Sequence, residues 1–297
     1  MRRIPARRGR RLTTKARGAA AVGSGPPETE ALFELAGEPS PGTGTVPIRH
    51  RLLDRLPHTD ADLRALASQL PPRWVDVSLS EESLPRGSVS ATDAIALVAS
   101  RVGISRLLHL ELVPGMRSLF DVTANQASAL FNAGETRRRV TSVLYVGAPG
   151  SQAPVHTDRH HNLFLHLRGV KKFVVGCYED PARQLAAVED VFSGRSPRPE
   201  PSELERVTTH TLRAGDGLYV PPDTFHWIEN GDYTTASVNC AWTTAATELA
   251  IVVHTANSLL RRLGLRPGPP GRHPTIDRVK ASGLSVASRA RSVRSRR

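Results

Sequence analysis

A change of hydrophobic periodicity at Arg139 limits the folds open to this chain more than any other feature. Beyond it, seven or eight short apolar stretches alternate with turn signals such as Gly-Asp, Pro-Pro and Asn-Gly-Asp, as β-strands and their turns do. Many short strands in succession are typical of a barrel or a double-sheet jelly roll. We therefore expect a mainly β protein with flanking helices, whose jelly-roll core is a double-stranded β-helix over residues 139–244. The expected strands are Val140–Val146, Asn162–Leu167, Lys171–Cys177, Thr208–Leu212, Gly217–Val220, His226–Glu229 and Thr234–Trp242.

The segments on either side of this core have helical spacing. Residues 46–138 are expected to form a helical N-terminal part that packs on the core, and residues 245–266 a C-terminal helix. The apolar side chains of that last helix are expected either to pack on the core or to form a homodimer interface. The expected elements outside the core are a strand at Trp74–Leu79 and helices at Glu28–Ala36, Asp60–Leu70, Thr92–Val102, Pro114–Phe131 and Thr247–Leu263.

The positive charge of the chain is concentrated at its two ends. The 297 residues carry a formal net charge of +12, but residues 1–17 hold eight basic residues and residues 278–297 hold seven, with no acidic residue in either segment. Without these charges, residues 18–277 carry −3. Residues 1–45 and 267–297 are expected to be disordered basic tails. Such tails make weak, nonspecific contacts with nucleic acid, but these lack the interleaved aromatic residues that stack on bases.

Composition also limits the cellular setting. Cys177 and Cys240 are too few for a disulfide framework, so both are expected to be buried, reduced thiols. No stretch approaches the roughly 18 consecutive apolar residues of a membrane span, and the Arg-rich start lacks the apolar core of a secretory signal. We expect a cytoplasmic protein without membrane contact.

Two motifs within the strand block carry side chains that bind metal ions. His156 and Asp158 stand at i and i+2, which on an extended backbone places both side chains on one face. His226 follows a Gly-Asp turn, a short apolar strand and a Pro-Pro corner. Two imidazoles and one carboxylate on one face of a metal ion form the facial triad of non-haem Fe(II) oxygenases, which leaves coordination positions open. The alternative is a barrel whose histidines only pack.

The residues around both motifs resemble a known family. The stretch from His156 to Phe173, followed by the stretch from Gly215 to His226, is similar to the Jumonji-C/cupin-like group of Fe(II)- and 2-oxoglutarate-dependent oxygenases. It is most similar to the branch that contains the asparaginyl hydroxylase of hypoxia signalling and its bacterial relatives. The resemblance covers residues 139–244, about a third of the chain. It implies an enzyme that hydroxylates a C–H bond of a protein, a peptide or a small molecule.

The resemblance also assigns roles to individual residues. It implies that His156, Asp158 and His226 are the catalytic ligands of an Fe(II) ion, with 2-oxoglutarate as cosubstrate. It places Lys171 opposite the distal carboxylate of 2-oxoglutarate, and a buried dicarboxylate needs a cation there on physical grounds as well. Lys172 is the alternative, because neighbouring residues of a strand face opposite sides. Two further positions that line the site in relatives are occupied by Asn162 and Asn239.

One position departs from the family pattern. Relatives commonly have a threonine three residues before the first iron-binding histidine, where its hydroxyl helps to bind the cosubstrate, and this chain has Ala153 there. This departure favours an alternative function, a non-catalytic cupin-like protein that binds a metal or a partner. The side chains that are candidates to replace the missing hydroxyl are Tyr145, Ser142, Ser151 and Gln152.

Overall fold

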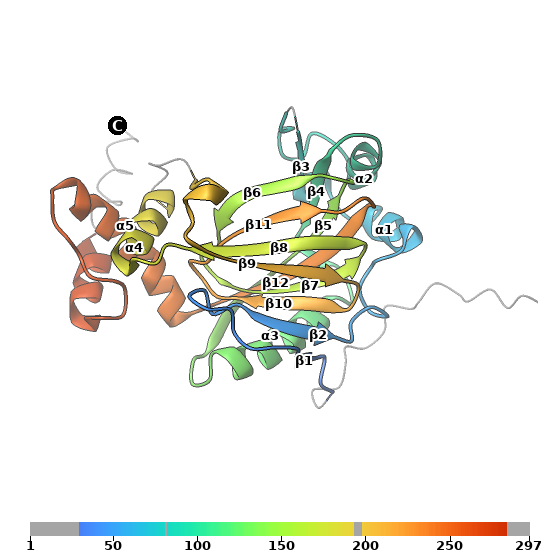
Figure 1. Ribbon diagram of the computed structural model, residues 1–297. Coiled ribbons are helices and arrows are strands. Elements are labelled where there is room, and N and C mark those ends of the chain that lie inside the picture. Colours follow the sequence, from blue (N-terminus) through green and yellow to red (C-terminus); the bar gives the residue numbers. More distant parts are fainter. Residues whose placement is uncertain (1–29, 81, 193–197, 284–297) are drawn as a thin grey trace, which may run out of the picture.

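The structure, a computed structural model, describes residues 30–80, 82–192 and 198–283. In this part of the chain two antiparallel sheets face each other and helices flank them, which confirms the expected mainly β fold (Figure 1). The larger sheet has the strand order β1-β2-β10-β7-β12-β5-β4-β3, and the smaller sheet has the order β6-β11-β8-β9. The strands are β1 (Phe33–Leu35), β2 (Val46–His50), β3 (Val75–Leu79), β4 (Gly103–Leu108), β5 (Arg137–Gly147), β6 (Gln152–Thr157), β7 (His161–Arg168), β8 (Val170–Cys177), β9 (Arg206–Arg213), β10 (Asp216–Val220), β11 (Phe225–Asn230) and β12 (Thr235–Thr244).

The helices begin at residues that cap them. The Thr59 hydroxyl accepts a hydrogen bond from the Asp62 amide at the start of α1, and the Thr244 hydroxyl accepts one from Thr247 at the start of α5. The helices are α1 (Asp60–Ala67), α2 (Ala91–Ser100), α3 (Arg117–Phe131), α4 (Pro181–Phe192) and α5 (Ala245–Arg262), with 3₁₀ turns η1 (Pro72–Trp74), η2 (Leu110–Leu112) and η3 (Pro201–Glu203).

The two faces of the larger sheet have different neighbours. Its outer face packs against α3, where Phe120, Leu163 and Trp242 belong to the main hydrophobic core. Its inner face meets the smaller sheet across a second cluster, which includes Phe164 and Phe173. Because side chains alternate along a strand, neighbours such as Leu163 and Phe164 of β7 serve different layers. The candidate site lies in the inner layer, between the sheets.

The N-terminal residues of the described chain differ from expectation. A helix at Glu28–Ala36 is wrong for its described part, because Phe33–Leu35 forms β1. The helical pattern expected from Val46 is also wrong at its start, where β2 pairs with β1 on one side and with β10 of the core on the other. β2 has only two buried apolar side chains, Val46 and Ile48, so pairing with the core decides its conformation rather than local pattern.

Four other helices or strands were not among the expected ones. They are β6, where only an extended backbone around His156 and Asp158 was expected, β4, α4 and a helix at 274–283. The last of these lies in the segment assigned to the C-terminal tail, and Asp277 within it is buried. The remaining parts of the two expected tails, residues 1–29 and 284–297, lie outside the described residues.

The expectations for the cysteines and for membrane spans can be compared with the described residues. Cys177 and Cys240 are free and buried, as expected. None of the helices in the described ranges is both long and apolar enough to cross a bilayer.

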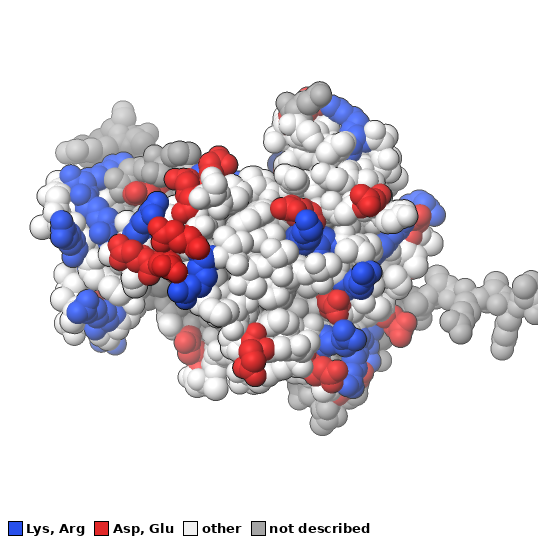
Figure 2. Space-filling view, viewed as in Figure 1, with Lys and Arg blue, Asp and Glu red and all other residues white. Residues whose placement is uncertain are grey.

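Both signs of charge are interspersed on the face drawn in Figure 2, with ion pairs such as Arg183–Glu205 near α4. Along α5, Val253 is buried whereas Leu263 is exposed, and the homodimer through this helix stays a prediction.

Candidate metal centre and adjoining cavity

Three side chains from two neighbouring strands meet between the sheets. His156 lies on β6, Asp158 directly follows β6, and His226 lies on β11. β6 and β11 are antiparallel neighbours with His156 opposite His226, and the centres of the two imidazole rings are 4.1 Å apart. One ligand atom from each of the three residues lies within 4.8 Å of the other two. The predicted group is therefore brought together at a spacing that can hold a metal ion.

Backbone carbonyl groups fix the orientation of both imidazoles. Nδ1 of His156 lies 2.8 Å from the carbonyl oxygen of Pro154, and Nδ1 of His226 lies 2.9 Å from that of Thr224. A carbonyl oxygen only accepts, so each Nδ1 carries the proton and each Nε2 keeps its lone pair. Nε2 of His226 lies 3.9 Å from Oδ2 of Asp158. The free nitrogen of His226 thus faces the carboxylate, as two ligands of one ion would.

The environment of His156 and Asp158 favours the protonation states of these two residues that bind metals. Burial, followed by the charge of His226, lowers the pKa of His156 to about 4. Burial opposes ionisation of Asp158, but His226, His156 and a hydrogen bond from Asn162 outweigh it and lower the pKa of this carboxyl. Nδ2 of Asn162 donates that hydrogen bond to Oδ2 of Asp158 over 3.3 Å. Neutral imidazole and ionised carboxylate are the forms that coordinate a divalent cation.

A cavity of about 780 Å³ opens beside the three ligands. Its walls come from the inward faces of both sheets. One part of the wall is apolar, and the rest carries charged and hydrogen-bonding side chains. Apart from the ligands, its lining includes Phe164, Phe173, Ile228, Ala153, Lys171, Tyr145, Asn239, Gln152, Ser151, Asp76, Ser78 and Arg106.

Of the two adjacent lysines, Lys171 lines the cavity. It pairs with Asn230 in the β8–β11 register, whereas Lys172 is exposed and forms a 3.3 Å ion pair with Glu229. Lys171 is 4 % exposed, and its Nζ lies 5.2 Å from the centre of the Phe164 ring. Among the described residues, no hydrogen bond or ion pair to the side-chain ammonium group of Lys171 is found. Burial lowers the pKa of Lys171 to about 7.

The other predicted side chains lie around the ligands. Asn239 and Tyr145 line the cavity, and Nδ2 of Asn239 lies 3.4 Å from the Tyr145 hydroxyl. Burial, followed by the charge of Asp158, raises the pKa of Tyr145, so its hydroxyl stays protonated. Oδ1 of Asn162 and Oδ1 of Asn239 are buried without a partner in the described part of the chain. Such unpaired buried groups point to a missing ligand or water.

The structure narrows the candidates for the hydroxyl missing at Ala153. Ser142 is not among the side chains that line the cavity, and its hydroxyl donates to Glu111 over 2.7 Å. The Ser151 hydroxyl lines the cavity but is already engaged, since it donates to a backbone carbonyl over 2.7 Å and accepts from Asn230 over 2.9 Å. Two of the four candidates therefore stay available on the cavity wall, Tyr145 and Gln152.

The sequence analysis missed the wall that β3 and β4 contribute. Arg106 of β4 donates to Asp76 over 2.8 Å and to Ser78 over 3.0 Å, and all three line the cavity. Strand β4 was not predicted because its residues are mostly buried on both faces, so polar and apolar residues do not alternate along it. Arg106, a charged residue in a mostly apolar stretch, was the one local indication of a functional position.

Comparison with known proteins agrees with the fold. Residues 109–248 match the family described as the cupin-like domain, which supports the placing of this segment in the cupin-like superfamily. The match begins well before residue 139, where the core was expected to start. A search of curated proteins found no match.

Proposed function

We propose that this protein is an Fe(II)- and 2-oxoglutarate-dependent oxygenase that hydroxylates a C–H bond of its substrate. One observation carries the proposal. A His-Asp-His group shares a single cavity with a buried lysine that has no ion-pair partner among the described residues. A dicarboxylate that chelates a metal at one end and meets a cation at the other satisfies both features at once.

The donor set suits Fe(II). Two neutral imidazoles and one carboxylate, from His156, His226 and Asp158, are the ligands of a facial triad with open positions. The carbonyl groups that hold both Nδ1 atoms and the amide of Asn162 form an outer layer of hydrogen bonds, which orients the ligands before the ion binds.

The cavity suits 2-oxoglutarate. Lys171 would pair with the distal carboxylate, which relieves the cost of burying this cation alone. Tyr145 and Asn239, on strands β5 and β12 of the larger sheet, line the same cavity and offer further hydrogen-bonding groups. The apolar side chains of Phe164 and Phe173 exclude water from the space between the lysine and the ligands.

The metal and its cosubstrate supply the oxidising power when bound: one oxygen atom of O₂ enters the substrate as a hydroxyl, and the other enters succinate as 2-oxoglutarate loses CO₂. The role of the chain is to bind, orient and shield. The Arg106–Asp76 pair balances charge at the wall of the cavity formed by β3 and β4. That wall suits a substrate with hydrogen-bonding groups, whether a protein, a peptide or a small molecule.

A second candidate function is a non-catalytic cupin-like protein that binds a metal ion or a partner. The observation in its favour is Ala153, which puts a methyl group on the wall where relatives have a hydroxyl. In this case the chain would bind a divalent metal without consuming 2-oxoglutarate.

Turnover separates the two candidates. Purified protein is incubated with Fe(II), O₂, cell extract and 2-oxoglutarate, and succinate and products heavier by one oxygen atom are measured by mass spectrometry. The oxygenase predicts both in the wild type and in Lys172→Met, and neither in His156→Ala or Lys171→Met. Metal binding without succinate release in any extract would favour the non-catalytic protein.

A further inference from the structure

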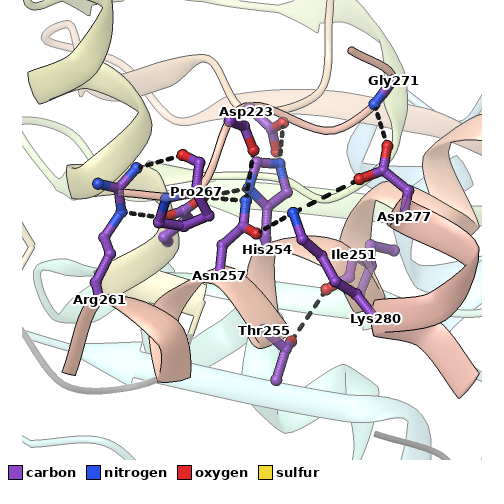
Figure 3. A network of polar contacts seen from close by, with 12 residues as sticks. Asp223, Ile251, His254, Thr255, Asn257, Arg261, Pro267, Gly271, Asp277 and Lys280 are labelled. Atoms are coloured by element: carbon purple, nitrogen blue, oxygen red, sulfur yellow. Dashed lines mark hydrogen bonds and ion pairs between the residues drawn. The ribbon is translucent and has the colours of Figure 1, made fainter. Parts of the chain in front are cut away.

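A network of buried and half-buried polar side chains lies outside the cavity and joins the C-terminal helices to the loop between β10 and β11, which precedes His226. In Figure 3, Asp223 of the loop between β10 and β11 meets His254 of α5, and Asn257 of α5 meets Lys280, which pairs with Asp277. Glu189 of α4 joins the two parts, because it faces both His254 and Asn257. Buried charged groups are costly unless they are paired, so a network of this extent needs an explanation.

Asp223 touches the metal site through its backbone. Its amide donates to the carbonyl oxygen of Asp158 over 2.9 Å. The next residue, Thr224, provides the carbonyl oxygen that holds Nδ1 of His226 at 2.9 Å. One short turn therefore fixes the backbone of one ligand and the ring of another. Asp223 has a φ of 66°, a left-handed conformation that non-glycine residues adopt at a cost, so the turn needs support from outside.

His254 provides that support. Its Nε2 lies 3.0 Å from Oδ2 of Asp223, and its side chain is 4 % exposed. Its other nitrogen, Nδ1, lies 3.8 Å from Oε1 of Glu189 on α4, a carboxylate that is completely buried. Burial alone would lower the pKa of His254, but the two carboxylates raise it to about 9, so the side chain is an imidazolium. Nε2 therefore donates to Asp223, whereas Nδ1 faces Glu189 at an ion-pair distance without a hydrogen bond.

Glu189, on the opposite side of the ring from Asp223, holds His254 in place. Glu189 also accepts hydrogen bonds from Asn257 over 2.7 Å and from Arg261. Asn257 in turn accepts from Lys280 over 2.7 Å, which ties the helix at 274–283 to α5. A ring that is fixed on one side by helices α4 and α5 can fix Asp223 on the other.

We propose that the Asp223–His254 pair is a positioning device that holds the β10–β11 turn, and through it Asp158 and His226, in the arrangement that binds the metal ion. This inference rests on the proposed metal site. Neither residue touches the ion; both act through the carbonyl of Thr224 and the backbone of Asp158. Helices α4 and α5, which carry Glu189 and His254, would then be part of the site's support and not only of its stability.

Two substitutions at Asp223 test the pair without straining the turn. Asp223→Gly keeps the left-handed backbone and removes the side chain, whereas Asp223→Asn also tolerates that backbone and still accepts from His254. Lys280→Met is the matched control, because it removes a cation from the same network at a place with no contact to Asp223. The dissociation constant of Co(II) and its visible absorption spectrum are measured, together with the melting temperature of the metal-free protein.

The expected result is a Co(II) affinity about 10- to 100-fold lower in Asp223→Gly, with an altered spectrum, as for other losses around metal ligands. Asp223→Asn should bind within about threefold of wild type, and Lys280→Met should melt earlier with unchanged affinity. If Asp223→Gly does not fold, His254→Leu breaks the same contact and His254→Gln restores a donor. Wild-type affinity in the broken variants, or affinity that falls equally in Lys280→Met, would overturn the inference. A wild type that binds no Co(II) would overturn the proposed function as well.

Discussion

Lys171→Met is expected to stabilise the metal-free protein and to weaken its binding of 2-oxoglutarate strongly. Lys171 is 4 % exposed, and no hydrogen bond or ion pair to it is found among the described residues. Methionine fills a similar volume beside Phe164 without bringing a charge. The substitution therefore removes an unpaired buried cation and keeps the packing.

The pKa of this lysine sets the size of the effect. Burial lowers it from 10.5 to about 7. Each unit of pKa corresponds to about 1.4 kcal/mol, so burial of this side chain lowers the free energy of unfolding by roughly 4 kcal/mol at pH 7. Between these two pKa values the unfolded chain binds the proton more tightly than the native protein, so wild-type stability rises with pH across that window. We expect the free energy of unfolding of Lys171→Met to be about 2 to 4 kcal/mol higher than that of the wild type at pH 7. We also expect the stability of this variant not to rise with pH between the two pKa values.

Denaturant unfolding followed by circular dichroism measures the gain, with Lys172→Met as the control. Lys172 has a 58 % exposed side chain and one ion pair, with Glu229, so its loss should change stability by less than about 1 kcal/mol. In metal-loaded protein, Lys171→Met should bind 2-oxoglutarate about 100-fold more weakly, and Lys172→Met as wild type does. If the two variants were equal in stability and in affinity, Lys171 would not be the unpaired cation of the cavity.

Three further outcomes are expected. A bound carboxylate raises the pKa of Lys171 from about 7, so the affinity for 2-oxoglutarate should fall about tenfold for each pH unit above 7. Calorimetry at several pH values measures this affinity, and an affinity that does not change with pH would contradict the prediction. A divalent metal at about 100 times its dissociation constant should stabilise the wild type by about 2.7 kcal/mol in thermal unfolding, and an equal gain in His156→Ala would show that the metal binds elsewhere. Glu189→Gln should lower the free energy of unfolding by about 3 kcal/mol, because it leaves His254 and Arg261 without the buried carboxylate that they share. Glu38→Gln, at an exposed position, should leave the free energy of unfolding almost unchanged. Similar unfolding curves for the two variants would contradict the role of Glu189.

The sequence was most informative where local pattern and tertiary structure agree. The strands around His226 are short, apolar and bounded by Gly and Pro signals, and they form where expected. The i, i+2 spacing of His156 and Asp158 survives in the structure because β6 is extended up to the residue before Asp158. Inward and outward alternation along β8 also settles which of the two lysines, Lys171 or Lys172, faces the cavity.

Other features depend on contacts between distant segments, and local pattern does not reveal them. β2 is extended because it pairs with β10, more than 160 residues later in the chain. The ion pairs of His254 join residues 31 and 65 positions away, which no spacing rule connects. For α4 the local signal was present, since Pro181 is followed by good helix formers, but no element was predicted between Cys177 and Thr208.

Calorimetric titration of 2-oxoglutarate into the protein, with and without Mn(II) in place of iron, decides whether the His-Asp-His group and the buried lysine act on one ligand. We expect one molecule bound per chain with the metal, almost none without it, and a large loss in Lys171→Met but not in Lys172→Met. Equal binding in the absence of metal, or full binding by Lys171→Met, would contradict a shared dicarboxylate site.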